Sequence, residues 1–335
     1  MGRWADPECL APPSFELHAR LADEHNGEEN WGYRKVTSAD CDTVRYHNEA
    51  QLQQNPVTAT RGGLISPDDL DWVKSSVFKW FKPLGDTAQV HPYLFTNAVL
   101  RLALEAGVEL ITGQALSITR SENGKEVKSV LFRDPQHEDS RELPATNVIL
   151  AAGPWTRRIL PEAPIGAEKS HSIVVDPKRP ISGSILFFDP GNVDVKDLEN
   201  QLEIYPRPDS TVYMSGQTDY GMPLPDTTED VHVDEGRCEK LLQTVGTVSE
   251  ELGASEIRIK QACFRPLVEV EGRDVELGPF LGETGVKGLL LAAGHNQWGI
   301  QNSPISGKVL SELVFEGVAK SANISILDPR EHLRF

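Results

Sequence analysis

Two segments with the same four residues, Leu150-Ala-Ala-Gly153 and Leu291-Ala-Ala-Gly294, each end an apolar run with a glycine turn. Within 147–153 and 288–294, residues 148–152 and 289–293 are all apolar, which predicts buried parallel strands. Ligands bind at the carboxyl ends of such strands in open α/β sheets. A buried strand followed by glycine is also a common packing motif. Two copies that flank an antiparallel segment favour a ligand site.

Helices are predicted beside both strands. Residues 92–106 form a helix with Pro92 near its first position, and the chain then enters a strand at 108–112. A short helix follows Pro154, and another begins at Ser303-Pro304, where Ser303 can cap the first turn. The pattern at 13–26 predicts a helix, which is not the strand that opens a nucleotide-binding domain.

The segment between the two strands has the pattern of an antiparallel sheet. A hairpin around Asn123-Gly124 precedes it, with strands at 115–120 and 127–133. We therefore expect an α/β domain from residues 1–165 and 285–320, with an antiparallel domain at 166–284 inserted into it. The inserted domain has strands at 182–188, 201–205, 211–215 and 257–264, and one amphipathic helix at 234–252.

Composition excludes several classes of function. The chain has 335 residues and a net charge of −17, which repels nucleic acid and anionic lipid. Its apolar runs are far shorter than the ~20 residues of a membrane span. The four cysteines are widely spaced and predict neither a metal site nor a disulfide scaffold. The ends carry no targeting signal that we can identify, so a cytoplasmic location is expected.

Five motifs, taken together in their order and spacing, resemble the D-amino-acid oxidase superfamily of FAD-dependent oxidoreductases, which includes glycine oxidase and sarcosine oxidase. The resemblance covers roughly residues 60–318, and the Gly-His-x-x-Trp-Gly-Ile form is most similar to fungal members. The motifs are Gln89-Val-His-Pro-Tyr-Leu-Phe95, 148–156, 205–216, Phe264-Arg-Pro266 and 292–307.

The resemblance implies FAD as the cofactor and a small-molecule amine or amino acid as the substrate. A hydride would pass from the carbon that bears nitrogen to the flavin, water would hydrolyse the resulting imine, and oxygen would reoxidise the flavin. The start of the helix at Ser303-Pro304 would face the flavin and stabilise negative charge on it. The residues implied to bind the cofactor are Ala152, Gly153, Trp155, Gly294, His295, Trp298, Gly299 and Ile300. For His295, a loop imidazole bonded to backbone is the alternative.

The resemblance also assigns substrate residues. Arg265 would bind a substrate carboxylate, because a guanidinium donates two parallel hydrogen bonds to it. An ordinary ion pair in an acidic chain is the alternative. Tyr205, Arg207 and Tyr213 would lie on the substrate-facing sheet, with Tyr205 in a catalytic role. Strand side chains alternate, so each of the three could equally lie on the other face.

One motif of the family is missing. A dinucleotide fold needs Gly-x-Gly-x-x-Gly after its first strand, and the sequence contains no such motif. The expected fold is therefore an incomplete Rossmann-type FAD-binding domain, without its first βαβ unit, and an inserted antiparallel-sheet substrate domain. Strand edges left unpaired by the gap would reduce stability and promote aggregation. The alternative function is a catalytically inactive relative that acts as a binding or sorting protein.

Overall fold

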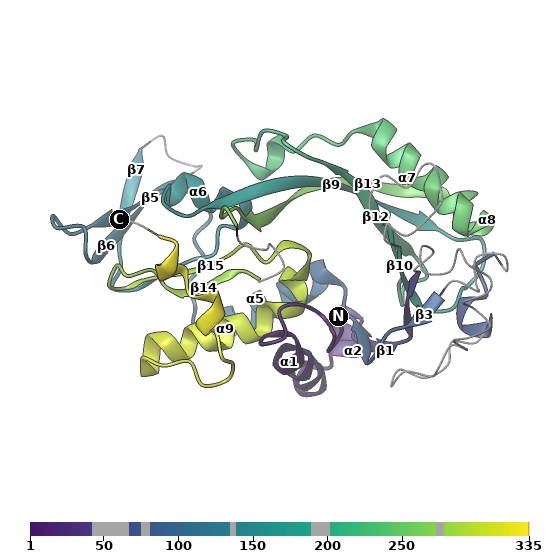
Figure 1. Ribbon diagram of the computed structural model, residues 1–335, viewed down its shortest axis with the longest axis horizontal. Coiled ribbons are helices and arrows are strands. Elements are labelled where there is room, and N and C mark those ends of the chain that lie inside the picture. The colour runs from purple at the N-terminus through teal and green to yellow at the C-terminus, as the bar shows by residue number, and fades with distance from the viewer. Residues whose placement is uncertain (42–66, 75–80, 135–138, 189–201, 273–277, 334) are drawn as a thin grey trace. The chain divides into compact units, whose positions relative to one another are not determined.

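The computed structural model describes residues 1–41, 67–74, 81–134, 139–188, 202–272, 278–333 and 335. The chain forms two compact units (Figure 1). The first unit comprises Met1–Trp4, Gly27–His91 and Lys169–Cys263. The second unit comprises Ala5–Asn26, Pro92–Glu168 and Phe264–Phe335. None of the described helices is long and apolar enough to span a membrane.

The first unit is built on a seven-stranded sheet in the order β13-β9-β12-β11-β10-β2-β3. The strands predicted within 182–188, 201–205, 211–215 and 257–264 are confirmed, although residue 201 lies outside the described residues. Their bounds are β10 Ile185–Phe188, β11 Leu202–Pro206, β12 Val212–Asp219 and β13 Glu256–Val268. The other strands are β9 Ile165–Asp176, β2 Ser38–Cys41 and β3 Phe81–Pro83, with β1 Arg34–Val36 pairing β4 Thr87–Gln89 separately.

This grouping differs from the expected division of the chain. Residues 27–91 group with 169–263, whereas the sequence placed them with 1–165. The cause is strand pairing, since β2 runs parallel to β10 with Ser38 opposite Ile185. Which segments serve as the FAD-binding and substrate domains stays a prediction.

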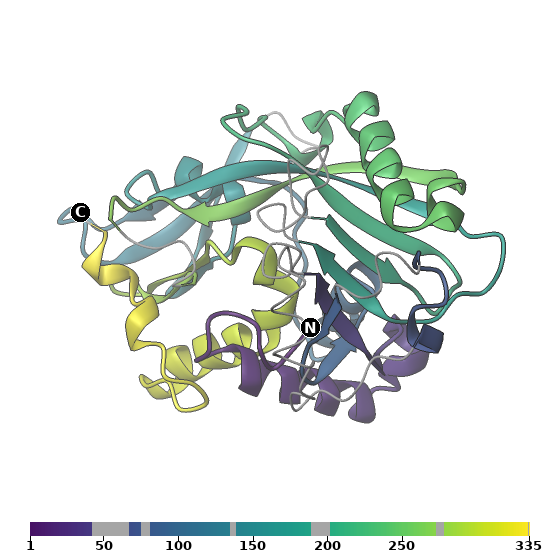
Figure 2. The ribbon, with the colours of Figure 1, turned by 45° about the vertical axis from the view of Figure 1, so that its right-hand side comes forward.

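One face of the seven-stranded sheet forms the core of the first unit. Along β11, Leu202 and Ile204 are buried in this core, and Val212 and Met214 of β12 join them. Helices α7 (Glu235–Val248) and α8 (Glu250–Gly253) supply the other half of the core (Figure 2). A single helix was predicted at 234–252. It is interrupted because Ser249 adopts an extended conformation and its Oγ caps α8 by accepting from Leu252 N.

In the second unit, the two predicted parallel strands are confirmed. Strand β8 (Val148–Leu150) pairs in parallel with β15 (Leu289–Ala293), with Leu150 opposite Leu291, and β14 (Phe280–Glu283) pairs antiparallel on the other side of β15. The predicted hairpin is also present, as β5 Gln114–Arg120 and β6 Val127–Arg133, and β7 Ser140–Pro144 extends it.

The predicted strand at 108–112 is wrong. After α5 (Pro92–Glu105) these residues form no strand, and Val108, Leu110 and Ile111 are exposed. A strand needs a neighbour for its backbone hydrogen bonds, and the three-stranded sheet ends at β8 within the described part of the chain. Ile149 of β8 is also 44% exposed, so this edge is apolar.

Helix α9 begins earlier than predicted. It spans Gly299–Glu316, with Trp298 as its N-cap, so Ser303-Pro304 lies inside the helix and not at its start. Pro304 has no N–H, which leaves the Ile300 carbonyl without its usual donor. Ser303 Oγ donates to that carbonyl at 3.1 Å, and His18 Nε2 lies 2.9 Å from it. The helix therefore continues through its proline.

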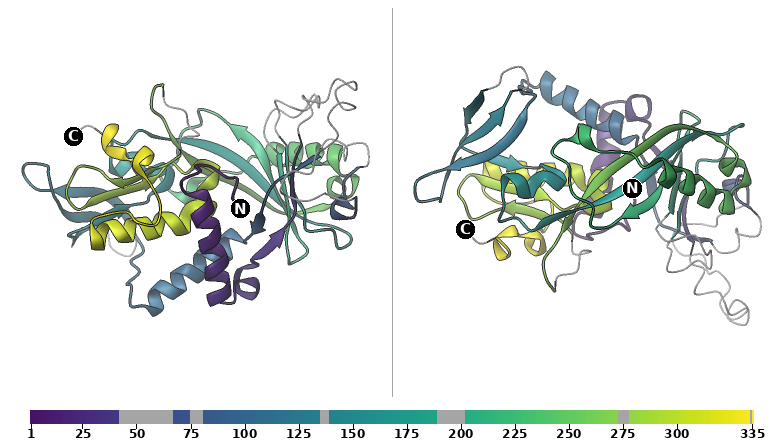
Figure 3. Two further views of the ribbon diagram at one scale, coloured as in Figure 1. Left: turned by 60° about the horizontal axis from the view of Figure 1, so that its bottom comes forward. Right: turned by 90° about the horizontal axis from the view of Figure 1, so that it is seen from above.

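Helix α1 (Ala11–Glu24) stabilises this part of α9, and the two lie side by side (Figure 3). Ser14 Oγ donates to Gln301 O at 2.7 Å and accepts from Ile305 N at 3.4 Å. The hydroxyl thus bridges a carbonyl and an amide of the α9 backbone. The remaining short helices are α2 Gly27–Trp31, α6 Thr156–Ile159, and the 3-10 turns η2 Pro67–Leu70, η3 Gly153–Trp155, η5 Thr228–Asp230, η7 Asn296–Trp298, η8 Ser325–Leu327 and η9 Pro329–Glu331.

Candidate functional site

Two glycine loops leave the same end of the parallel pair in the second unit. Because β8 and β15 are parallel neighbours in register, the loop into η3 and the loop into η7 both begin at their carboxyl ends. Gly153 and Gly294 start the turns with positive φ values of 53° and 86°. The structure therefore brings together the residues predicted to bind a cofactor: Ala152, Gly153, Trp155, Gly294, His295, Trp298, Gly299 and Ile300.

The two glycines have different surroundings. A Cβ added to Gly294 would lie 2.6 Å from Val268 Cγ2 and 3.3 Å from Ile165 Cδ1, so close packing excludes a side chain there. A Cβ added to Gly153 would meet nothing within 4 Å. Gly294 therefore lets its loop pack against the core, whereas Gly153 presents bare backbone to open space.

His295 makes a hydrogen bond to a side chain, whereas the alternative to its predicted cofactor role was a bond to backbone. Its Nε2 lies 3.1 Å from Ser306 Oγ, on the second turn of α9. Burial lowers the pKa of His295 to about 4, so the ring is neutral at pH 7. The imidazole is therefore an uncharged group with a fixed orientation at the base of the loop.

Arg265 reaches the same loop from β13. Its Nη1 lies 3.5 Å from Oε1 of Gln297, between Asn296 and Trp298. Its Nη2 lies 3.5 Å from Glu168 Oε2, with the Arg265 side chain 23% and the Glu168 side chain 11% exposed. The guanidinium is thus held beside the loop by one neutral and one charged acceptor, both at long distance.

Asn296 was missed by the sequence analysis. It has a positive φ of 50°, and its Oδ1 is buried without a hydrogen-bond partner among the described residues. Buried acceptors are normally satisfied. An unsatisfied one in this loop suits a bound molecule that offers an N–H group. No local sequence signal distinguishes this asparagine from an ordinary loop residue.

In the first unit, the structure settles which sheet face carries the predicted aromatic residues. Tyr205, Arg207 and Tyr213 alternate with the buried core residues of β11 and β12, so all three lie on the face opposite α7. Glu203 and Phe187 lie on the same face, although the sequence analysis did not single them out. We call the surface formed by Phe187, Glu203, Tyr205, Tyr213 and Ser215 the polar-aromatic face.

A carboxylate organises the polar-aromatic face. Tyr205 Oη donates to Glu203 Oε2 at 2.7 Å, and Ser215 Oγ donates to the same oxygen at 3.3 Å. Burial, together with Glu203, raises the pKa of Tyr205 well above its usual value, so the phenol is a donor at neutral pH. Tyr205 lies in the first unit and Arg265 in the second, and the catalytic role of each stays a prediction.

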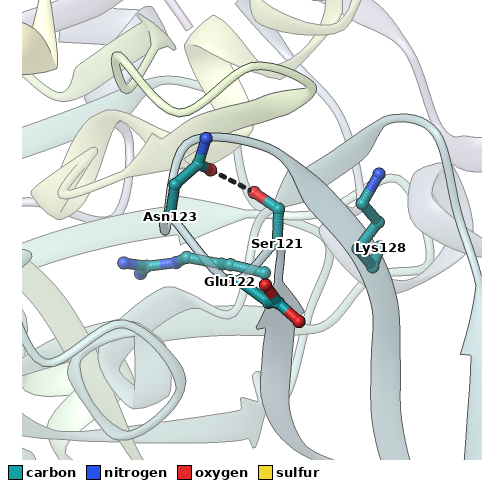
Figure 4. Close-up of a pocket in the computed structure, with 5 residues that line it drawn as sticks. Ser121, Glu122, Asn123 and Lys128 are labelled. Atoms are coloured by element: carbon teal, nitrogen blue, oxygen red, sulfur yellow. Dashed lines mark hydrogen bonds between the residues drawn. The ribbon is translucent and has the colours of Figure 1, made fainter.

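A shallow depression at the β5–β6 turn is unrelated to these residues (Figure 4). Ser121 Oγ donates to Asn123 Oδ1 at 2.7 Å, a bond that shapes the turn. The depression is lined by Arg120, Ser121, Glu122, Asn123 and Lys128. None of these was a predicted site residue, and the geometry is explained by the hairpin alone.

Comparison with known proteins identifies the family. The family described as FAD dependent oxidoreductase (DAO) matches residues 9–313. The chain belongs to this family. The Schizosaccharomyces pombe protein C1F5.03c, named provisionally as an oxidoreductase, is 31% identical over 98% of this chain and 84% of its own length. The predicted family and FAD as its cofactor are confirmed.

Solved structures show the same fold. Glycine oxidase from Geobacillus kaustophilus has a TM-score of 0.73 and 18% identity, covering 99% of this chain and 86% of its own. Iminodiacetate oxidase from Chelativorans sp. BNC1 has a TM-score of 0.72 and 19% identity, covering 97% and 85%. The chain therefore has the same mixed α/β fold as these two oxidases.

The residues of the two loops fit part of FAD. The bare backbone at Gly153 and the unsatisfied Asn296 Oδ1 are suited to a flat ring with N–H groups. The first amides of α9 belong to Gly299 and Ile300 and add partial positive charge. The pyrophosphate is not matched in the same way, since the sequence contains no Gly-x-Gly-x-x-Gly motif.

Proposed function

We propose that the protein oxidises an amine or amino acid with FAD, and that Arg265 binds the substrate carboxylate. The observation that carries the proposal is the 3.5 Å contact between Arg265 Nη1 and Gln297 Oε1. It sets a carboxylate-binding group beside the loop that carries His295 and Trp298, within one unit. Glycine oxidase and iminodiacetate oxidase, which share the fold, are named for amino-acid substrates.

FAD held by the loops that begin at Gly153 and Gly294 would supply a two-electron acceptor for a hydride from the substrate carbon that bears nitrogen, and oxygen would reoxidise it. The chain's own residues orient the substrate and tune the charge around the cofactor. Arg265 fixes the carboxylate, which leaves the α-carbon and the amine at a defined distance from the guanidinium. Neutral His295 adds no positive charge to the loop, so the α9 amino terminus is the main local dipole that favours negative charge.

One carboxylate of the chain itself competes with the proposed substrate for Arg265. Glu168 Oε2 lies 3.5 Å from Nη2 and is a carboxylate like the proposed ligand. The pair is weak because 3.5 Å exceeds the usual donor–acceptor distance of a hydrogen bond, about 2.7–3.2 Å. A substrate carboxylate that makes two short bonds to the fork would displace Glu168. We also propose a catalytic role for Tyr205 and a cytoplasmic location for the protein.

Arg265→Ala tests the proposal in FAD-loaded protein. We expect KM for carboxylate substrates to rise about tenfold to a hundredfold, and KM for neutral amines of the same length to stay within about twofold. Arg258→Ala is the matched control, because Arg258 lies on the same strand and pairs with Asp176 in solvent. Equal losses on both substrate classes would remove the assigned role of Arg265.

A further inference from the structure

Three consecutive polar side chains in the loop before α9 differ in their bonding. His295 Nε2 lies 3.1 Å from Ser306 Oγ, and Gln297 Oε1 accepts from Arg265 Nη1 at 3.5 Å. Asn296, between them, has a buried Oδ1 without a hydrogen-bond partner among the described residues. The second unit therefore supplies partners for the two outer side chains, and its described part supplies none for the amide oxygen in the middle.

The backbone holds Asn296 in a conformation that few residues adopt. Its φ is 50°, in the left-handed region, and the Trp298 N–H donates to His295 O at 2.9 Å across the turn. Asparagine tolerates this region better than most residues, and glycine adopts it readily. A glycine would also avoid burying an acceptor without a donor, which is unfavourable. The asparagine oxygen is therefore expected to have a partner when the site is filled.

The partner of this oxygen must be a hydrogen-bond donor, because an amide oxygen accepts and does not donate. A carboxylate, such as the one that Arg265 is proposed to bind, offers no donor. The oxidised flavin ring has a single N–H group, at nitrogen N3. A substrate ammonium group is also a donor, but it gains more from a charged acceptor than from a neutral amide. The ring N–H is therefore the donor that suits this neutral oxygen best.

The loop of Asn296 also lies where a ring can approach. Gly153 and Gly294 each stand three positions after a residue of the paired couple Leu150 and Leu291. The two loops therefore begin roughly 4.8 Å apart, one strand spacing. A Cβ added to Gly153 would meet nothing within 4 Å, so its backbone borders open space. One flat ring is large enough to contact both loops.

We propose that Asn296 Oδ1 accepts a hydrogen bond from the N–H group of the flavin ring. The inference rests on FAD as the cofactor of the proposed function, and it names the side chain that recognises the single donor of the ring. The site is then selective for a flavin with an intact N–H. A methyl group at N3 removes the donor and places carbon against the buried oxygen, which stays unsatisfied.

FAD methylated at N3 tests the inference together with Asn296→Gly, which removes the oxygen and still adopts the positive φ. Flavin fluorescence measures the affinity for both forms of FAD without any amine. We expect methylation to weaken binding about fivefold to a hundredfold in wild type and less than about twofold in Asn296→Gly. Asn26→Gly is the matched control and should behave as wild type, because Asn26 has a φ of 51°, belongs to the same unit and is exposed.

Asn296→Asp is a second variant that keeps an acceptor at the same position. A charged acceptor bonds an N–H more strongly, so the preference for unmethylated FAD should exceed that of wild type. A preference that is unchanged or smaller in Asn296→Asp would contradict the inference even if Asn296→Gly does not fold.

The binding experiment separates this inference from the proposed function. An equal loss on methylation in wild type and Asn296→Gly, no preference in wild type, or wild-type protein that binds neither form would overturn the inference. Selective FAD binding through Asn296, in a protein whose flavin no amine reduces, would support the inference and refute the proposed function alone.

Discussion

Arg265 on β13 and Gln297 in the loop before α9 are joined by a 3.5 Å contact between Nη1 and Oε1. Strand β13 thereby delivers a carboxylate-binding group to the loop that follows β15, although the two residues are 32 positions apart in the chain. Substrate binding and cofactor binding are for this reason expected to be coupled through the loop conformation.

Glu168→Gln should improve carboxylate binding. The substitution removes the anion that competes for Arg265 Nη2 but keeps a side chain of the same size. We expect KM for carboxylate substrates to fall about threefold to tenfold, with no change for neutral amines. Steady-state kinetics on both classes measures this. A rise in KM would mean that Glu168 positions Arg265 and does not compete with the substrate.

Sequence reasoning was most successful where one local pattern decides the outcome. The buried runs that became β8 and β15, and the Asn123-Gly124 hairpin, depend on hydrophobic period and turn chemistry alone. It failed at α9, because the helix passes Pro304 only with the help of Ser14 and His18 from α1. Such tertiary partners leave no trace in the local sequence.

The candidate site shows the same division. Glycine turns marked the two loops, but no pattern singled out Asn296, whose significance lies in a buried oxygen without a hydrogen-bond partner among the described residues. The segment 108–112 has the composition of a strand but no partner strand among the described residues, since pairing is a property of the sheet and not of the segment.

Ser14→Ala should destabilise the second unit. The hydroxyl is buried and bonds to Gln301 O and Ile305 N, so its loss removes two hydrogen bonds between α1 and the α9 backbone. We expect the free energy of unfolding to fall by about 1–3 kcal/mol. Thermal and denaturant unfolding measure this. Ser303→Ala, which removes an exposed hydroxyl from Ile300 O, is the control and should cost less than about 0.5 kcal/mol.

His18 should make stability fall in mild acid. Burial lowers its pKa from 6.5 to about 4, against the hydrogen bond to Ile300 O, which raises it. The unfolded chain therefore binds the proton first, and stability that is complete above pH 6.5 is lost as the pH falls toward 4. Between pH 7.5 and pH 5 the contribution of this residue is on the order of 2 kcal/mol.

The matched measurement compares wild type with His18→Gln. Glutamine can still donate to Ile300 O but does not titrate, so the variant should lose less stability over the same pH range. Because His295, whose pKa is also lowered to about 4, is present in both proteins, its contribution cancels. Identical pH dependence in the two proteins would show that His18 is not the group that titrates.

Ile149→Lys should reduce aggregation. Ile149 lies on the edge strand β8 and is 44% exposed, and a charge on an edge strand opposes pairing with another chain. When the protein is concentrated, the variant is expected to scatter less light than wild type. Its free energy of unfolding should stay within about 1 kcal/mol of wild type. Val318→Lys is the control, since this 51% exposed residue follows α9 and lies on no sheet edge. Equal scattering by both variants would mean that the β8 edge is not the aggregating surface.

Anaerobic reduction of the bound flavin tests the central claim most directly. Purified protein is loaded with FAD, oxygen is removed, and the absorbance of the oxidised flavin is followed as amines and amino acids are added one at a time. The account predicts bleaching by an amino acid, slower bleaching in Arg265→Ala, and recovery of the oxidised spectrum when air is admitted. FAD that binds but is bleached by no amine or amino acid, although dithionite reduces it, would contradict the account.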